Sequence, residues 1–293
     1  SLGVLSLLGK RVPLSLKIFL TAFAVVDDIG GILVIAVFYS SHVAYGYLLV
    51  AILLLILLYF VGKRAVTNKL FFLVIGVVIW YLFLQSGIHS TIAGVLLAFV
   101  IPAKPQLRVG RYIERIRRII NTFPVMGEND IVLTNEQIAQ LKRVESASDR
   151  VISPLQSLED NLHGVVNYII LPLFAFVNAG VVFSGGGEVI GEVSIAVALG
   201  LLCGKFLGIY FFTWLAVKSK LTPMPQGMDW KNIAGVALLG GIGFTVSLFI
   251  ANLSFGVTHP VLLNQAKFGV LSGTALAGIL GYIVLYLVLP KKR

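Results

Sequence analysis

Eight uninterrupted apolar stretches constrain this chain more than any other feature of its sequence. Crossing a hydrocarbon core of roughly 30 Å takes about 20 helical residues. The stretches lie at about 18–39, 46–61, 70–85, 87–101, 164–183, 193–217, 231–255 and 268–289. Those at 46–61 and 87–101 are short, so either is compatible with a partly re-entrant segment. The pattern predicts an all-α polytopic membrane protein with about eight transmembrane helices.

The composition excludes the main alternatives to a membrane protein. Only 12% of the residues are charged and 58% are hydrophobic, whereas a soluble domain carries roughly 25% charged residues. This excludes a soluble globular fold and a disordered chain. A disulfide framework is excluded as well, because the chain has a single cysteine, Cys203.

The distribution of lysine and arginine predicts the orientation in the membrane. Nine of the 23 basic residues lie in 102–163, and the connections 40–45 and 184–192 have none. Basic connections remain on the cytoplasmic side, so both ends of the chain are expected in the cytoplasm. The net charge of +10 is then an orientation signal, and no nucleic-acid partner is expected.

This orientation gives a five-part organisation. We expect the end of a helix and a cytoplasmic turn at 1–17, four transmembrane helices in 18–101, an amphipathic cytoplasmic connector at 102–163, four transmembrane helices in 164–289 and a cytoplasmic tail at 290–293. The chain opens with Ser1 and an apolar segment. We interpret that segment as the end of a span whose beginning is absent, so the sequence is expected to be truncated at its N-terminus.

The connector contains two predicted helices. In 107–120, Ile113, Ile116 and Ile120 fall on one helical face with arginines around the rest, a pattern that favours binding to the anionic lipids of the cytoplasmic leaflet. The second helix begins at Thr134, followed three residues later by Gln137, the spacing of a capping box. Neither helix carries a catalytic pattern. The whole sequence has no phosphate loop, nucleophile elbow or metal-ligand spacing, so we expect no enzyme activity and no cofactor.

Three charged residues fall inside the predicted spans. Asp27 and Asp28 lie near the middle of the first span, and Lys205 lies near the middle of the sixth. A charge at the centre of a membrane helix costs roughly 2.5–3.5 kcal/mol on insertion scales, and such residues are usually functional. We therefore expect Lys205 to pair with one aspartate in an ion-binding and proton-exchanging cleft. The alternative is a static charge cluster that only orders the helices.

The seventh span contains the sequence GGIGFT, with Gly240, Gly241, Gly243 and Thr245. Such a glycine-rich segment is expected to break its helix and free backbone groups at membrane depth, beside a polar cavity. Broken helices of this kind form the ion sites of secondary transporters. A small-residue packing face is the alternative.

Two further positions are candidates for a response to pH. His163 follows Glu159 and Asp160 within about one helical turn, just before the fifth span, and His89 begins the fourth. An imidazole ordinarily changes its charge near neutral pH. For the group around His163, a plain polar cluster at a helix entry is at least as good an explanation from spacing alone.

Several strings together resemble one known family. AVVDDIGGILVIAVFY, SGIHSTIAGVLLAFVIPAK, SLEDNLHGVVNYIILPLFAFVNAGV, GLLCGKFLGI and GVALLGGIGFTVSLFIANLSF are similar, in this order, to NhaA-type sodium/proton antiporters of bacterial inner membranes. The resemblance covers essentially the whole chain. It implies an inverted-repeat transporter fold with broken helices, with about eight of the family's twelve transmembrane helices present.

The resemblance also implies residue roles. Asp28 would be the principal ligand for Na⁺ or Li⁺, Asp27 would pair with Lys205, and GGIGFT would be the unwound helix. Glu159, His163 and His89 match positions that respond to pH, but Asp160 stands where a histidine is common. The family's broken helix with a Thr-Asp motif and its dimer-forming β-hairpin would lie before Ser1, so a homodimer is only a possible partner.

The function implied is secondary active transport, in which Na⁺ or Li⁺ is exchanged for H⁺ across the bacterial inner membrane. The exchange would be electrogenic and regulated by pH. Two alternatives from the residues alone are a gated cation channel, in which the aspartates only select the ion, and a non-transporting membrane subunit.

Overall fold

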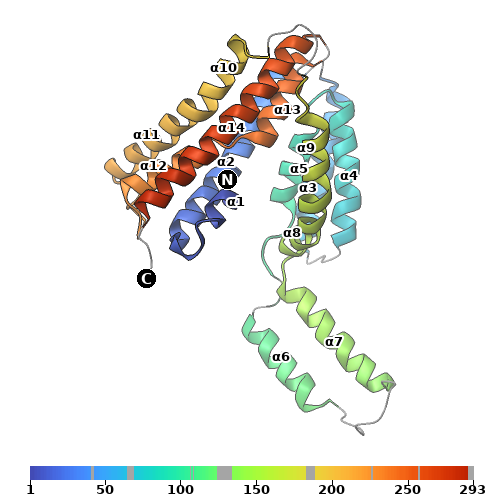
Figure 1. Cartoon of the computed structure of the whole chain (residues 1–293). Helices are drawn as coiled ribbons and strands as arrows, with labels where there is room; N and C mark the ends of the chain where they lie inside the picture. The colour runs from blue at the N-terminus through green and yellow to red at the C-terminus, as the bar shows by residue number, and fades with distance from the viewer. Residues whose placement is uncertain are drawn as a thin grey trace. The chain divides into compact units, whose positions relative to one another are not determined.

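The computed structural model describes residues 1–40, 43–64, 69–105, 107, 109–123, 134–182, 189–225, 227–256 and 258–289, and within these ranges it contains helices and no strand (Figure 1). The first half contains α1 (Leu2–Ser6), a 3₁₀ turn η1 (Gly9–Arg11), α2 (Leu14–Phe38), α3 (Tyr45–Lys63), α4 (Lys69–Gln85), α5 (Thr91–Val100), α6 (Val109–Asn121) and α7 (Asn135–Val151). The second half contains α8 (Pro154–Val165), a π-helical segment η2 (Val166–Ile170), α9 (Leu171–Asn178), α10 (Glu192–Leu199), a π-helical segment η3 (Gly200–Gly204), α11 (Lys205–Lys218), α12 (Trp230–Leu239), α13 (Phe244–Phe255) and α14 (Pro260–Val288). The all-α prediction is confirmed.

The chain divides into two compact units. The first consists of Ser1–Ile35 and Leu171–Arg293, and the second of Ala36–Ile170. The first unit is therefore built from both ends of the chain.

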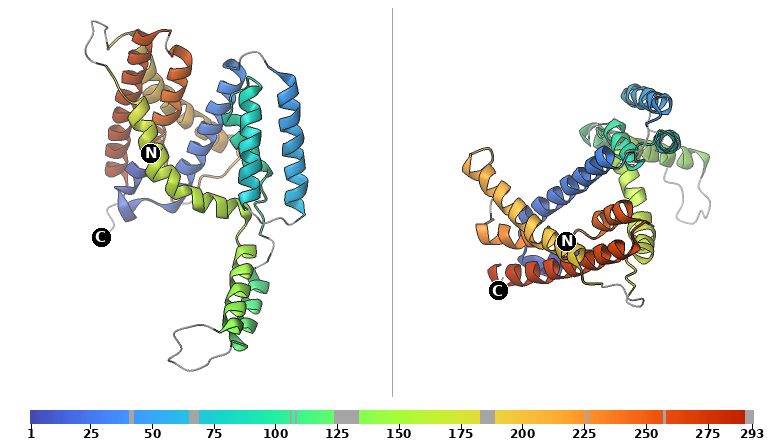
Figure 2. Two further views of the ribbon diagram at one scale, coloured as in Figure 1. Left: turned by 90° about the vertical axis from the view of Figure 1, so that its right-hand side faces the viewer. Right: turned by 90° about the horizontal axis from the view of Figure 1, so that it is seen from above.

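In the first unit, α14 lies against α10 and α12 (Figure 2), and it meets them through glycines. A Cβ atom added at Gly269 would come 2.5 Å from the carbonyl oxygen of Ser194 in α10, and one added at Gly281 would come 2.6 Å from Leu239 in α12. Glycine therefore lets neighbouring helices approach closely, as in other membrane helix pairs. Leu20, Leu239 and Leu285 are fully buried in the adjoining apolar core.

In the second unit, α3, α4 and α5 pack around Leu58, Phe72 and Ile79, which are almost completely buried. A Cβ atom at Gly76 would overlap the side chain of Leu97, so α4 and α5 also meet closely.

The two helices of the connector lie side by side (Figures 1 and 2). The predicted capping box is confirmed: Gln137 donates its backbone amide to Thr134 Oγ1 (3.3 Å), and Thr134 donates its own to Gln137 Oε1 (2.9 Å). On α6, Ile113 and Ile120 are exposed, Ile116 is half-buried and Ile119 is buried. The segment 124–133 between the helices lies outside the described residues.

All eight predicted stretches contain helix. Five helices have the length and composition of a membrane span: Leu14–Phe38, Tyr45–Lys63, Pro154–Asn178, Glu192–Lys218 and Pro260–Val288. The bent pair α12 and α13 makes a sixth span if it is counted as one, and α4 and α5 are shorter apolar helices. The stretch at 46–61, expected to be short, belongs to a 19-residue helix, whereas the one at 87–101 contains a helix of only 10 residues.

Two helices begin well before their predicted spans. The fifth begins at Pro154 and the last at Pro260, although the apolar stretches were placed at 164 and 268. In both cases proline occupies the first turn of the helix, where its missing amide hydrogen is not needed. Lys267 consequently lies within α14 and not in a connection. The predicted tail at 290–293 lies outside the described residues.

Candidate functional site

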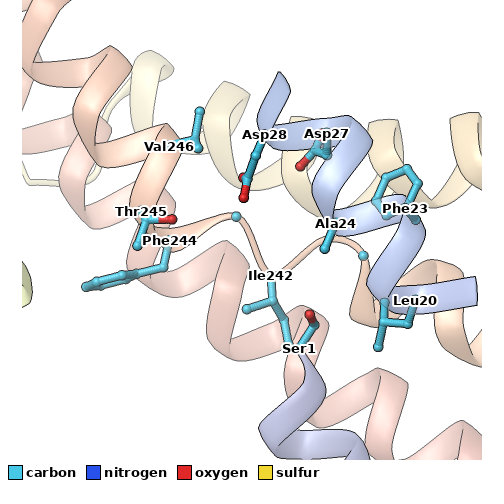
Figure 3. A pocket seen from close by; sticks show the side chains of 12 residues that line it. Ser1, Leu20, Phe23, Ala24, Asp27, Asp28, Ile242, Phe244, Thr245 and Val246 are labelled. Atoms are coloured by element: carbon cyan, nitrogen blue, oxygen red, sulfur yellow. The ribbon is translucent and has the colours of Figure 1, made fainter. Parts of the chain in front are cut away.

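Helix α2 directs its two adjacent aspartates to different surroundings. Successive residues of a helix are separated by about 100° around its axis. Lys205 at the start of α11 donates to Asp27 Oδ2 at 2.5 Å, which confirms that the lysine approaches the aspartate pair. Asp28 instead faces the chain between α12 and α13 (Figure 3).

Asp28 lies at a cavity of about 260 Å³. The residues that line this cavity come from α2, the α12–α13 break and the chain start: Ser1, Leu20, Phe23, Ala24, Asp27, Asp28, Gly240, Ile242, Gly243, Phe244, Thr245 and Val246 (Figure 3). All of them belong to the first unit. The cavity thus combines two carboxylates with the free backbone of a broken helix.

The break between α12 and α13 was predicted from GGIGFT, and the structure contains it. The two helices are bent by 43°, and the amides of Gly241 and Ile242 donate to carbonyls three residues earlier, at 2.9 and 3.1 Å. The first amides of a helix have no partner within it. Phe244, Thr245 and Val246 therefore present backbone donors, and the positive end of the α13 dipole, on the side of the cavity that Asp28 faces.

The predicted glycines have different roles at this break. Gly240 and Gly243 line the cavity together with Thr245, but Gly241 does not. A Cβ atom at Gly241 would lie 2.5 Å from the carbonyl oxygen of Leu201, and one at Gly243 would lie 3.2 Å from Lys205 Nζ. The break therefore packs directly against η3 and the first residue of α11.

The π-helical segment η3 is a feature that sequence reasoning missed. It runs from Gly200 to Gly204 and is followed directly by Lys205. Short π-helical turns inside α-helices are often found at functional sites. The two glycines that bound it were the only signal in the sequence, and they are equally compatible with plain helix packing.

The predicted pH-response residues lie in the second unit. Asn167 Nδ2 lies 3.0 Å from His163 Nε2, one turn along the same helix. Glu159 and Asp160 are exposed on α8, and His89 is half-buried just before α5. The structure brings Asp27, Asp28 and Lys205 together at the break within the first unit, whereas Glu159, His163 and His89 belong to the second unit.

Comparison with known families matches residues 1–285 to the family described as Na⁺/H⁺ antiporter 1. Among curated relatives, the Na⁺/H⁺ antiporter NhaA of Bacteroides fragilis is 84% identical over 293 residues, which cover 100% of this chain and 67% of the relative. The antiporters named NhaA of Bacteroides thetaiotaomicron (80% identical, 100% and 67% covered) and Phocaeicola vulgatus (61% identical, 100% and 66% covered) are also similar. The chain thus spans about two thirds of the length of these relatives. On this evidence the chain is a member of the Na⁺/H⁺ antiporter 1 family.

Proposed function

We propose that the cavity between α2 and the α12–α13 break is the site at which this protein exchanges Na⁺ for H⁺ across a membrane. One observation carries the proposal: Lys205 neutralises Asp27, while the neighbouring Asp28 faces a cavity under a broken helix. We take Na⁺ and H⁺ as the exchanged ions because the relatives are named Na⁺/H⁺ antiporters.

The two aspartates divide the work. Asp27 forms the one ion pair that the described residues show, so its carboxylate already has a cation. Asp28 has a carboxylate that is open to the cavity, and it takes either Na⁺ or a proton. The Thr245 hydroxyl and the carbonyls of the Gly240–Gly243 break offer further oxygen ligands, which is how broken helices bind Na⁺ elsewhere. Li⁺, which also prefers oxygen ligands, is expected to bind the same set.

Exchange follows from competition at Asp28. A proton and a cation neutralise the same carboxylate, so only one of them can occupy it at a time. If only a neutralised site moves across the membrane, each cation carried one way is matched by protons carried the other way. The family resemblance implies more protons than cations per cycle, which makes the exchange electrogenic. Rocking of one helix bundle against another would open the site to each side in turn.

The proposal also covers the membrane, the orientation of the chain, its response to pH and its assembly. We place the protein in the bacterial inner membrane, with both ends of the chain in the cytoplasm, because the basic connections predict that orientation. Glu159, His163 and His89 are proposed to set the response to pH. The exposed Ile113 and Ile120 of α6, with the arginines around them, are proposed to contact anionic lipids of the inner leaflet, and a homodimer is proposed as the assembly.

Asp28→Asn provides the test. The variant keeps the size of the side chain but cannot lose or gain a proton, so Na⁺-dependent proton movement in everted membrane vesicles should be abolished. Glu145→Gln is the matched control, because it removes a carboxylate from the exposed surface of α7, and it should exchange at the parental rate. Normal exchange by Asp28→Asn, with equal amounts of protein in the membrane, would refute the assignment.

A gated cation channel and a non-transporting subunit are not favoured, because the relatives are named as antiporters. A channel would carry a current that follows the Na⁺ gradient and ignores pH. A subunit without transport activity would give no flux after reconstitution.

A further inference from the structure

Helix α13 is joined to its neighbours through glycines at both ends. Gly243 precedes it after the 43° bend, and Gly256 follows it with a backbone φ of +42°. Glycine has no Cβ atom and adopts a wide range of backbone angles. A glycine between two helices therefore does not fix how one helix is rotated relative to the next. The rotation of α13 about its own axis must therefore be set by its side contacts.

One set of these contacts is apolar. Leu248 is fully buried in a cluster with Leu201 and Val270. Val246 meets α2 at Gly31, where an added Cβ atom would lie 2.7 Å from Val246 Cγ1. Apolar packing of this kind holds α13 in place, but it is not directional.

A directional contact joins α13 to α9. Asn252 Nδ2 donates to Asn178 Oδ1 at 2.9 Å and to the carbonyl oxygen of Leu248 at 3.0 Å. Asn178 Nδ2 in turn donates to the carbonyl oxygen of Phe174 at 2.9 Å. Each amide is thus fixed against its own helix, and the hydrogen bond between the two amides sets how α13 is turned relative to α9.

The position of Asn252 links this contact to the ion cavity. Asn252 lies seven residues after Thr245, and seven residues of an α-helix turn by about 700°, only about 20° short of two full turns. Thr245 and Asn252 therefore share one face of α13. A rotation that separated Asn252 from Asn178 would carry Thr245 and the first turn of the helix away from the cavity.

We propose that Asn178 and Asn252 are positioning residues for the cation site: their hydrogen bond holds α13 in the rotation that presents Thr245 and its free backbone amides to the cavity beside Asp28. Neither asparagine lines that cavity, so both act through α13. This proposal rests on the proposed function of the cavity.

The test is the kinetics of Na⁺/H⁺ exchange in reconstituted vesicles of the whole chain. Asn252→Ala and Asn178→Ala should each raise the KM for Na⁺ about three- to tenfold, the range expected for an interhelical hydrogen bond in a membrane, while the maximal rate per protein stays close to parental. The double variant should be no worse than the worse single variant, because either substitution already removes the shared bond. Asn178→Asp keeps an accepting oxygen and should raise KM less than Asn178→Ala.

Asn264→Ala is the matched control. Asn264 in α14 makes two hydrogen bonds of 2.8 Å to the backbone of Val182, so this variant also loses an asparagine-mediated link without touching α13. Its KM should be unchanged. An equal rise in KM for Asn264→Ala, an unchanged KM in both alanine variants at the pair, or additive effects in the double variant would each overturn the positioning role. Failure of the proposed function itself is recognised separately, because Asp28→Asn would then still exchange.

Discussion

Two side chains of the same type, one position apart, are used differently in this protein. Both aspartates line the cavity, but Asp27 is bonded to Lys205, whereas Asp28 faces the chain between α12 and α13. The turn of about 100° between neighbours on a helix is enough to separate them. Pairing lowers the cost of holding two charges at membrane depth, and it leaves the Asp28 carboxylate for the ion that we propose to bind there.

The glycines that follow the aspartates provide a matched comparison. A Cβ atom at Gly31 would lie 2.7 Å from Val246 Cγ1, whereas one at Gly30 would meet nothing within 4 Å. Gly31→Ala should therefore destabilise the protein by about 1 kcal/mol, as mild overpacking does, and Gly30→Ala should not. Thermal unfolding of the purified protein measures the difference. Adding Val246→Ala should restore the stability of Gly31→Ala, and equal effects of the two glycine substitutions would contradict the close approach of α2 and α13.

At these positions the sequence predicted that the charges would pair, but it did not predict which of them would do so. Lys205 is the only basic residue near the middle of a predicted span, so its pairing with an aspartate was foreseeable from the sequence alone. Which aspartate it pairs with depends on the rotation of α2 and α11, and the residues alone do not determine this. The resemblance implied Asp27, and the structure confirms it.

At the scale of elements, the break between α12 and α13 requires glycine at position 241. A Cβ atom at Gly241 would lie 2.5 Å from a backbone oxygen, that of Leu201, which cannot move aside as a side chain would. Gly241→Ala should therefore abolish exchange in membrane vesicles. Gly204→Ala is the control, because nothing lies within 4 Å of its added Cβ atom, and it should retain exchange. Parental exchange by Gly241→Ala, at matched protein amounts, would show that the break does not depend on this contact.

Element boundaries show what an apolar pattern misses. The stretch that begins at 164 marks where the fifth span becomes continuously apolar, but the helix begins at Pro154, where the Ser153 side chain accepts a hydrogen bond from the Gln156 amide. Helix starts are made by polar caps and proline, so a search for apolar residues places them too late. At Thr134 the prediction used the cap itself, and there it agreed with the structure.

At the scale of the whole molecule, the predicted orientation can be tested with a membrane-impermeant thiol reagent. In a Cys203→Ser background, cysteines at the exposed positions Gly180 and Thr258 should be labelled from outside intact cells, because their connections lack basic residues or nearly so. Cysteines at the exposed positions Lys104 and Ser219 should be labelled only in everted vesicles. Labelling of Lys104→Cys from outside intact cells would show that the orientation is the opposite of the one predicted.

The sequence pattern could not predict which distant segments of the chain pack together. The first unit joins Ser1–Ile35 to Leu171–Arg293, and the cavity beside Asp28 lies wholly within it. An apolar stretch indicates that a helix will be buried or will face lipid. It gives almost no information about which other helix it will contact. The resemblance to a family supplied that information by joining Asp27, Lys205 and GGIGFT in one site.

The π-helical turn before Lys205 has a consequence for how this chain tolerates changes in length. Such a turn holds one residue more than an α-helical turn, so loss of any one residue between Gly200 and Gly204 would leave an uninterrupted α-helix. That shorter helix would keep Lys205 on nearly the same face, because the wider turn is what accommodates the extra residue. Deletion of one residue within the regular α-helix of α10 would instead turn Lys205 by about 100° relative to the residues before the deletion, and would separate it from Asp27 by register alone.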